Sequence, residues 1–139
     1  MKRTAFFQSE LCFWHTTGEA VLTAPVGGWL QPMAAGGHAE SPESKRRMRN
    51  LMDRSGLLSQ LAQQDAEPAS AKEIGAVHDA GYLAEFKALS DERGGMLGIS
   101  APFGHGSFEI ACQSAGLARE ALLSVLRGEN DTAYALTLS

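Results

Sequence analysis

The chain has 139 residues, of which 44% are apolar and 20% are charged, and its formal net charge at pH 7 is −4. This length and composition are typical of one soluble globular domain. The negative balance argues against a dedicated binder of nucleic acid or anionic membranes, which needs a broad basic field. No apolar run approaches the ~20 residues that span a bilayer, and the N-terminal apolar patch is too short for a signal peptide. We therefore expect a cytoplasmic protein with no membrane or nucleic-acid partner.

The first third of the chain predicts a strand, a long loop and a helix. Residues 3–7 are apolar and end in two aromatics, which suits a strand. Residues 8–38 are rich in Gly, Pro and Thr, and a loop this long in a compact domain is commonly functional. Ser41 can cap a helix with Pro42 at its first position, and Gly56 can end it. Its inward residues are predicted to be Met48, Leu51 and Met52, with Leu57 and Leu58 folding back onto them.

The middle of the chain predicts a short strand, two helices and a second loop. Residues 61–66 favour a weak strand. Ser70 and Glu73 have the spacing of a capping box, which opens a short helix that runs to His78. Asp79 can cap the next helix, which has an apolar face made of Tyr82, Leu83, Phe86 and Leu89. Residues 90–106 are rich in glycine and are expected to form a loop.

The last third predicts a long buried helix and a final strand. Ser107 is expected to cap the helix, and its inward face is predicted to be Ala111, Ala115, Ala118, Leu122 and Val125. Further apolar residues widen that face, so the helix is expected to be mostly buried. Gly128 can take the left-handed turn that follows, and residues 132–138 favour a strand. Helices and strands alternate, which predicts a layered α/β fold with at least partly parallel strands and with ligands bound beyond their carboxyl ends.

No catalytic group is evident from the residues alone. The four histidines (His15, His38, His78 and His105) are far apart, and Cys12 and Cys112 are isolated, so neither metal binding nor a disulfide framework is expected. His38 and His105 lie in glycine-rich loops and suit a rim position or a structural hydrogen bond. No nucleophile motif is present, and the glycines at 94–98 lack the ending of a phosphate loop. The residues therefore predict a scaffold with two long loops.

Eight short stretches, in a fixed order across nearly the whole chain, carry a resemblance. They are WHTTG at 14–18, QP at 31–32, HAESPESKRR at 38–47, SGL at 55–57, VHDAGYL at 77–83, GG at 94–95, GHGSFEIA at 104–111 and AYAL at 133–136. Together they resemble the N-terminal part of the zinc-dependent histone deacetylase superfamily, close to the bacterial deacetylase-like amidohydrolases and acetylpolyamine amidohydrolases. The resemblance implies that residues 1–139 are a partial domain of a three-layer α/β/α, arginase/deacetylase-like fold with a mostly parallel sheet.

The resemblance also implies hydrolysis of acetyl-lysine or acetyl-polyamine amides by the complete family domain. There, a zinc ion held by two aspartates and a histidine polarises the acetyl group, a histidine pair transfers protons, and a tyrosine stabilises the oxyanion. The first of these motifs follows the strand that matches residues 132–137, where this sequence reads Leu138-Ser139 and stops. We therefore expect no catalytic residue, no metal ligand and no cofactor in this chain, and no activity of the chain alone.

The resemblance does supply candidate residues for the rim of a substrate tunnel. In the family the first long loop lines the tunnel mouth, and the second supplies an aspartate that binds the substrate backbone in many relatives. The matching positions of the second loop hold Leu97, Gly98 and Ile99 here, which departs from that pattern. The candidate rim residues are Trp14, His15, Leu30, Pro32, Met33 and Ile99; a purely structural covering of the core is the alternative.

Two functions follow from these expectations. The first is a deacetylase-like scaffold that needs a partner chain to supply the catalytic part. The second is a non-catalytic assembly module, because three strands taken from a larger sheet leave an edge that can recruit another chain. The expected partners are accordingly a second copy of the chain, or a chain that carries the remainder of the domain.

Overall fold

Three parallel strands form the centre of the fold. A computed structural model describes residues 4–17, 20–21, 24–25, 38–98 and 101–137. The strands are β1 (Thr4–Gln8), β4 (Ala62–Gln64) and β7 (Thr132–Leu136), in the order β4-β1-β7. Both neighbours pair parallel to β1, with Ala5 opposite Ala62 on one side and Ala133 on the other. The predicted α/β class and the three predicted strands are therefore confirmed, and β4 and β7 are shorter than predicted.

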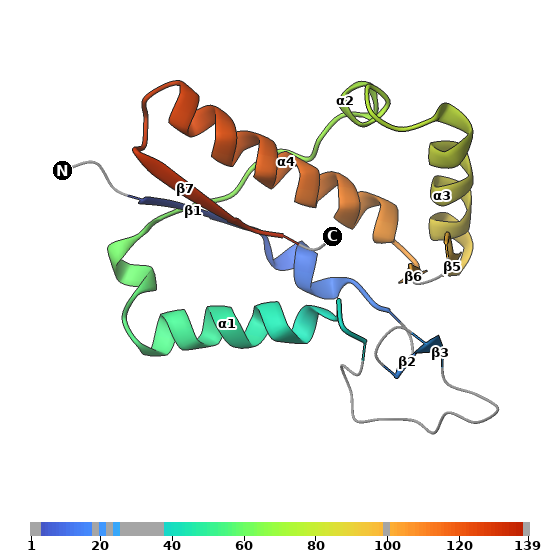
Figure 1. The fold of residues 1–139 in the computed structure, drawn as a ribbon, viewed down its shortest axis with the longest axis horizontal. Helices are drawn as coiled ribbons and strands as arrows, with labels where there is room; N and C mark the ends of the chain where they lie inside the picture. Colours follow the sequence, from blue (N-terminus) through green and yellow to red (C-terminus); the bar gives the residue numbers. More distant parts are fainter. Residues whose placement is uncertain (1–3, 18–19, 22–23, 26–37, 99–100, 138–139) are drawn as a thin grey trace.

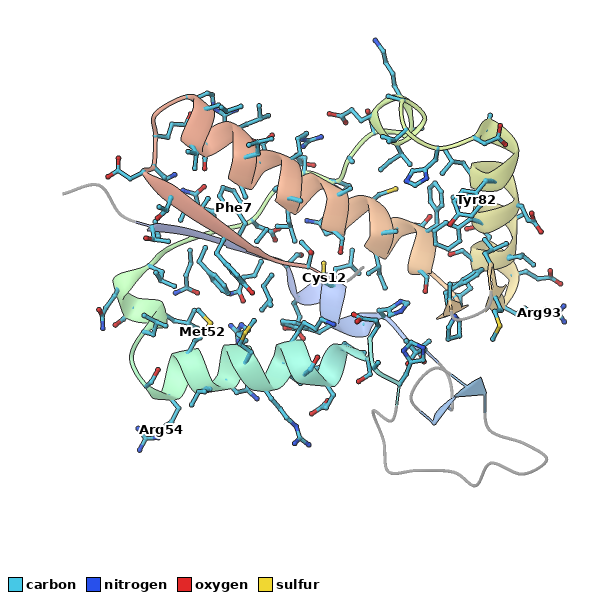
Figure 2. The ribbon with its side chains drawn as sticks, in the orientation of Figure 1. Phe7, Cys12, Met52, Arg54, Tyr82 and Arg93 are labelled. Atoms are coloured by element: carbon cyan, nitrogen blue, oxygen red, sulfur yellow. The ribbon has the colours of Figure 1, made fainter. Side chains whose placement is uncertain are left out.

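The two faces of the sheet are covered by different helices, which gives three layers (Figure 1). Ala5 and Phe7 of β1 pack with Leu117 and Ala121 of α4 (Ser107–Leu126). Phe6 points to the opposite face and packs in a second cluster with Phe13, Leu58 and Leu136, against which Met48 and Met52 of α1 (Pro42–Arg54) also lie. Figure 2 shows Phe7 on the α4 side and Met52 on the α1 side. Because successive side chains of a strand alternate between faces, β1 contributes to both layers.

Two leucines that were predicted to face inward, one in α1 and one after it, are exposed. Met48 and Met52 face the sheet as expected, but Leu51 is 69% exposed and Leu57 is also exposed. Arg49, two positions before Leu51, lies toward β1, where its Nε donates a hydrogen bond to Gln8 Oε1 at 2.8 Å. Only Leu58 folds back into the core.

The predicted inward face of α4 is wrong at three of its five named positions. Ala111, Ala118 and Leu122 are exposed, whereas the buried residues include the polar Gln113, Ser114 and Ser124. The polar side chains can be buried because they have partners. Gln113 Nε2, for example, donates to the backbone oxygen of Ala66 at 2.7 Å. The tight approach of residues 66–69 to the helix, and not the apolar period, sets which side of α4 faces inward.

Glycine at position 116 permits that approach. A Cβ placed on Gly116 would lie 2.2 Å from the backbone oxygen of Glu67 and 3.0 Å from the backbone nitrogen of Ala69. The Ala69 N–H in turn donates to the Cys112 backbone oxygen at 2.9 Å, so the strap formed by residues 66–69 is bonded directly to the helix.

The capping predictions were correct for two helices, correct in position alone for α1, and wrong for α4. Ser70 and Glu73 form the capping box of α2 (Ala71–Ile74), and Asp79 caps α3 (Ala80–Glu92). The bonds from Ser70, together with Arg119 of α4, lower the pKa of Glu73 from 4.5 to about 2. Ser41 stands at the cap position of α1, but its side chain makes no capping bond. The cap of α4 is Gly106, with φ +78°, and Ser107 is the first helical residue.

Both predicted loops contain short regular elements. In the first, η1 (Glu10–Trp14) is a 3₁₀ turn, and β2 (Ala20–Val21) pairs antiparallel with β3 (Ala24–Pro25). In the second, α3 continues to Glu92, and β5 (Gly94–Met96) pairs antiparallel with β6 (Pro102–Gly104). A further 3₁₀ turn, η2 (Leu58–Gln60), precedes β4. None of the helices in the described ranges is long and apolar enough to cross a bilayer.

The packing at position 116 gives a test of the fold. Gly116→Ala places a methyl group against backbone on three sides, and overpacking of this kind costs about 1–3 kcal/mol. Alanine gains only about 1 kcal/mol in helix propensity over glycine. Because the facing atoms are backbone and cannot rotate away, we expect the free energy of unfolding to fall in urea denaturation followed by circular dichroism. Ala118→Ser on the exposed side of α4 is the control and should change it by less than about 0.5 kcal/mol. An unchanged or raised stability of Gly116→Ala would contradict this packing.

Candidate functional site

A cavity of about 490 Å³ lies near the end of the molecule to which the carboxyl ends of the strands point. Its walls come from the segment after η1, the turn before α1, α3, β6 and the N-terminal half of α4. These elements meet there because α4 leads into β7, a strand parallel to β1, and so begins near the strands' carboxyl ends (Figure 1). Ligands of open α/β sheets bind at this edge, so the cavity is the candidate site.

The polar wall contains two histidines in different hydrogen-bonding states. His38 is only 5% exposed, and its Nδ1 accepts a hydrogen bond from the Glu40 backbone N–H at 3.0 Å. His15 is half-buried, and its Nδ1 lies 3.3 Å from the Ser107 hydroxyl. That hydroxyl accepts from the Gly104 N–H at 3.1 Å, so its own proton is free to point at His15. Burial, followed by repulsion from His38 and Lys45, lowers the pKa of His15 below 6.5, which favours a neutral ring at neutral pH.

The apolar wall is built from aromatic rings. Phe86 of α3 packs edge-on against Phe103 of β6, with ring centroids 4.8 Å apart, and against Phe108 of α4, at 5.4 Å. Such edge-to-face contacts hold rings in defined positions. Tyr82 lies in the gap between α3 and α4 (Figure 2), where it also lines the cavity. The contacts among the three phenylalanines thereby hold α3, β6 and α4 together around the cavity.

One ion pair borders the cavity. Glu40 lines it, and Lys45 Nζ lies 2.9 Å from Glu40 Oε2. The Lys45 side chain is largely covered, but the Glu40 side chain is 53% exposed, so solvent screens much of this attraction. The charge that Glu40 brings to the cavity is therefore balanced by its neighbour.

The six predicted rim residues do not all lie at the cavity. Trp14 ends η1 and is 72% exposed, and it does not line the cavity. His15 does line it. Leu30, Pro32, Met33 and Ile99 lie outside the described residues. A rim role in substrate binding stays a prediction for all six.

The main features of the cavity were not foreseen. His38 was considered for a rim position or a structural hydrogen bond, and it makes such a bond at Nδ1. Ser107 was interpreted as a helix cap, whereas its hydroxyl accepts from Gly104 and contacts His15. The aromatic residues at 86, 103 and 108 were visible in the sequence, but their meeting depends on how β6 and α3 fold against α4.

The described residues do not fit a metal centre. Among residues 4–17, 38–98 and 101–137, no group of three or more His, Cys, Asp or Glu side chains could hold a metal ion.

A solved structure shares this fold. No family model matches the chain. The structure aligns over 100% of its length with the HD domain of HDA15, with a TM-score of 0.80 and 17% sequence identity, and covers 36% of that chain. At that identity the likeness concerns the fold alone.

The sequence adds a closer relative. Over 136 residues, or 98% of the chain, it is 59% identical to the histone deacetylase-like amidohydrolase of Pseudomonas aeruginosa, and the match covers 36% of that protein. The predicted resemblance to the histone deacetylase superfamily is thereby confirmed. The chain spans about a third of the length of the relatives that it matches.

The environment of His15 gives a test of the site. We expect the His15 ring resonances to titrate with a midpoint below 6.5 in NMR, because burial and nearby positive charge oppose protonation. Lys45→Gln removes one of those charges and should raise the midpoint toward 6.5. Arg54→Gln, at the far end of α1 (Figure 2), is the matched control and should leave it in place. A midpoint above 6.5 in the unmodified chain would show that the ring is not buried as described.

Proposed function

We propose that this chain is a scaffold for a deacetylase-type amide hydrolase and becomes part of an active enzyme only together with polypeptide that carries the rest of the domain. The complete domain would hydrolyse acetyl-lysine or acetyl-polyamine amides. A zinc ion, held by residues outside this chain, would polarise the acetyl carbonyl. The name of the Pseudomonas relative, an amidohydrolase, supports the reaction class.

The outward face of α4 is the observation that carries the proposal. Ala111, Ala118, Leu122 and Leu126 form an apolar stripe along that face; Leu122 is 61% exposed, and the other three are exposed as well. A contiguous apolar surface on a soluble protein marks an interaction site. A domain about three times as long, as in the matched relatives, offers further helices that can cover it.

Complementation tests this function. The chain is mixed with the part of the Pseudomonas relative that lies outside the match, and release of acetate from an acetyl-lysine peptide is measured with and without zinc. We expect zinc-dependent hydrolysis from the mixture and none from this chain alone. Leu122→Glu should reduce the restored rate by at least about tenfold, because a carboxylate cannot be buried unpaired. Leu51→Glu, equally exposed on α1, is the matched control. A mixture no more active than the second polypeptide alone would contradict the proposal.

Self-association is the second candidate, and the outer edge of β7 favours it. Within the described ranges β7 pairs only with β1, and Tyr134 on it is 49% exposed. An unpaired strand edge is a template for another chain.

Sedimentation tests the second candidate. At tens of micromolar we expect a mass above the 14.8 kDa of one chain. Tyr134→Lys should shift the mass toward 14.8 kDa, since lysine on an edge strand discourages pairing. Leu51→Lys should not shift it. A monomer at every concentration would exclude assembly of this kind and leave the scaffold function untouched.

A further inference from the structure

Residues 70–78 form a segment that buries almost none of its surface. The segment comprises α2 and the turn that leads into α3, and Figure 1 shows it at the top of the view, between α4 and the start of α3. Within it only Ile74 is half-buried, and every other residue is exposed. Val77 is 83% exposed. A segment with so little buried apolar surface opens more readily than a packed element does.

One side chain of α4 holds this segment to the body of the molecule. Arg119 Nη1 lies 2.9 Å from both carboxylate oxygens of Glu73. The Nη2 of the same guanidinium donates to the backbone oxygen of Glu67 at 3.1 Å, which fixes the arginine to the strap. All other hydrogen bonds of residues 70–78 within the described ranges are internal to the segment. The ion pair is therefore a latch between the segment and α4.

The elements on either side of the segment are firmly attached. Before it, the Ala69 N–H donates to the Cys112 backbone oxygen at 2.9 Å. After it, α3 is held near its C-terminus, where Ser90 is fully buried and its hydroxyl accepts from the Phe108 N–H at 2.9 Å. The ring contacts of Phe86 add to this attachment. The segment is thus a loosely held connection between two anchored elements.

The segment also forms part of the cavity wall. Ile74 and His78 line the cavity, and its other walls come from elements outside the segment. One residue of those other walls is Cys112, whose side chain is buried and whose backbone oxygen bonds to the residue just before the segment. A movement of the segment away from α4 would take Ile74 and His78 out of the wall and widen the entrance to the cavity.

The charges of the latch determine what releases it. The Arg119 side chain is 27% exposed and the Glu73 side chain 45%, so dissolved salt screens their attraction. Hydrogen bonds from Ser70 and from Arg119 lower the pKa of Glu73 to about 2, so the carboxylate stays charged at neutral pH and in mild acid. Raised ionic strength, and not a small change of pH, is therefore the condition that loosens the latch.

We propose that residues 70–78 are a lid on the cavity, latched by the ion pair between Arg119 and Glu73, and that release of this pair swings the lid outward and admits molecules to the cavity. The lid and its latch use residues of this chain alone. They require neither zinc nor a second polypeptide, so the lid goes beyond the proposed function and is tested separately from it.

Amide hydrogen exchange followed by NMR tests the latch. The backbone N–H groups of Ile74 and His78 are hydrogen-bonded inside the lid and report its opening. Arg119→Gln removes the charge, and we expect these two amides to exchange about fivefold faster. Arg127→Gln is the matched control, because the ion pairs of Arg127 lie at the C-terminal end of α4, and it should leave their exchange unchanged.

Salt provides a second test of the latch without substitution. Raising KCl from about 0.05 M to about 1 M shortens the Debye length to about 3 Å, and should accelerate exchange at Ile74 in the unmodified chain but not in Arg119→Gln. The amides of Arg93 and Gly106 lie outside the lid and serve as references. No acceleration at Ile74, or equal acceleration at the reference amides, would overturn the lid.

Alkylation by iodoacetamide, followed by mass spectrometry, tests access to the cavity. Cys112 lines the cavity, whereas Cys12 is fully buried and does not line it. In Arg119→Gln, and in the unmodified chain at high salt, we expect alkylation of Cys112 to become about fivefold faster, in step with lid opening, while the rate at Cys12 stays the same. An unchanged rate at Cys112, or an equal rise at both cysteines, would contradict a lid that controls entry to the cavity.

Discussion

The pairing of β1 between two parallel neighbours is the constraint on which the rest of the structure depends. Its side chains alternate between two apolar layers, so the strand must be covered on both faces. Parallel neighbours need crossover connections, and α1 and α4 lie within those connections on opposite sides of the sheet (Figure 1). The same geometry brings the end of β1 and the start of α4 to one end of the molecule, where the cavity forms.

This core leaves two surfaces uncovered, one on α4 and one on β7. α4 has one side committed to the sheet and to the strap of residues 66–69, and an apolar opposite side that is exposed. β7 has one paired edge. Both features agree with a chain that matches about a third of a deacetylase-type relative. The cavity is different in kind, because its described walls are already assembled from segments of this chain.

Local chemistry was predictable, and contacts between distant segments were not. The capping box at Ser70 and the cap at Asp79 depend on residues three positions apart or fewer, and both were predicted. The inward face of α4 was mispredicted because small and apolar residues surround the helix. Gln113, which a periodicity argument places outside, is buried because the Ala66 carbonyl is there to accept its proton. For the site, the sequence shows the histidines individually, but it predicts neither the contact between His15 and Ser107 nor the edge-to-face packing of the phenylalanines.

The sequence by itself determined the α/β class, the three strands of the central sheet, the starts of most helices and the resemblance to the deacetylase superfamily, since these rest on short-range patterns and on motifs in a fixed order. Only the tertiary structure decided which side of each helix is covered and which aromatic rings meet. Those outcomes depend on groups that come together from distant parts of the chain: the Glu67 carbonyl against Gly116, and Phe86 of α3 against Phe103 and Phe108. No periodicity within a single segment encodes such a meeting.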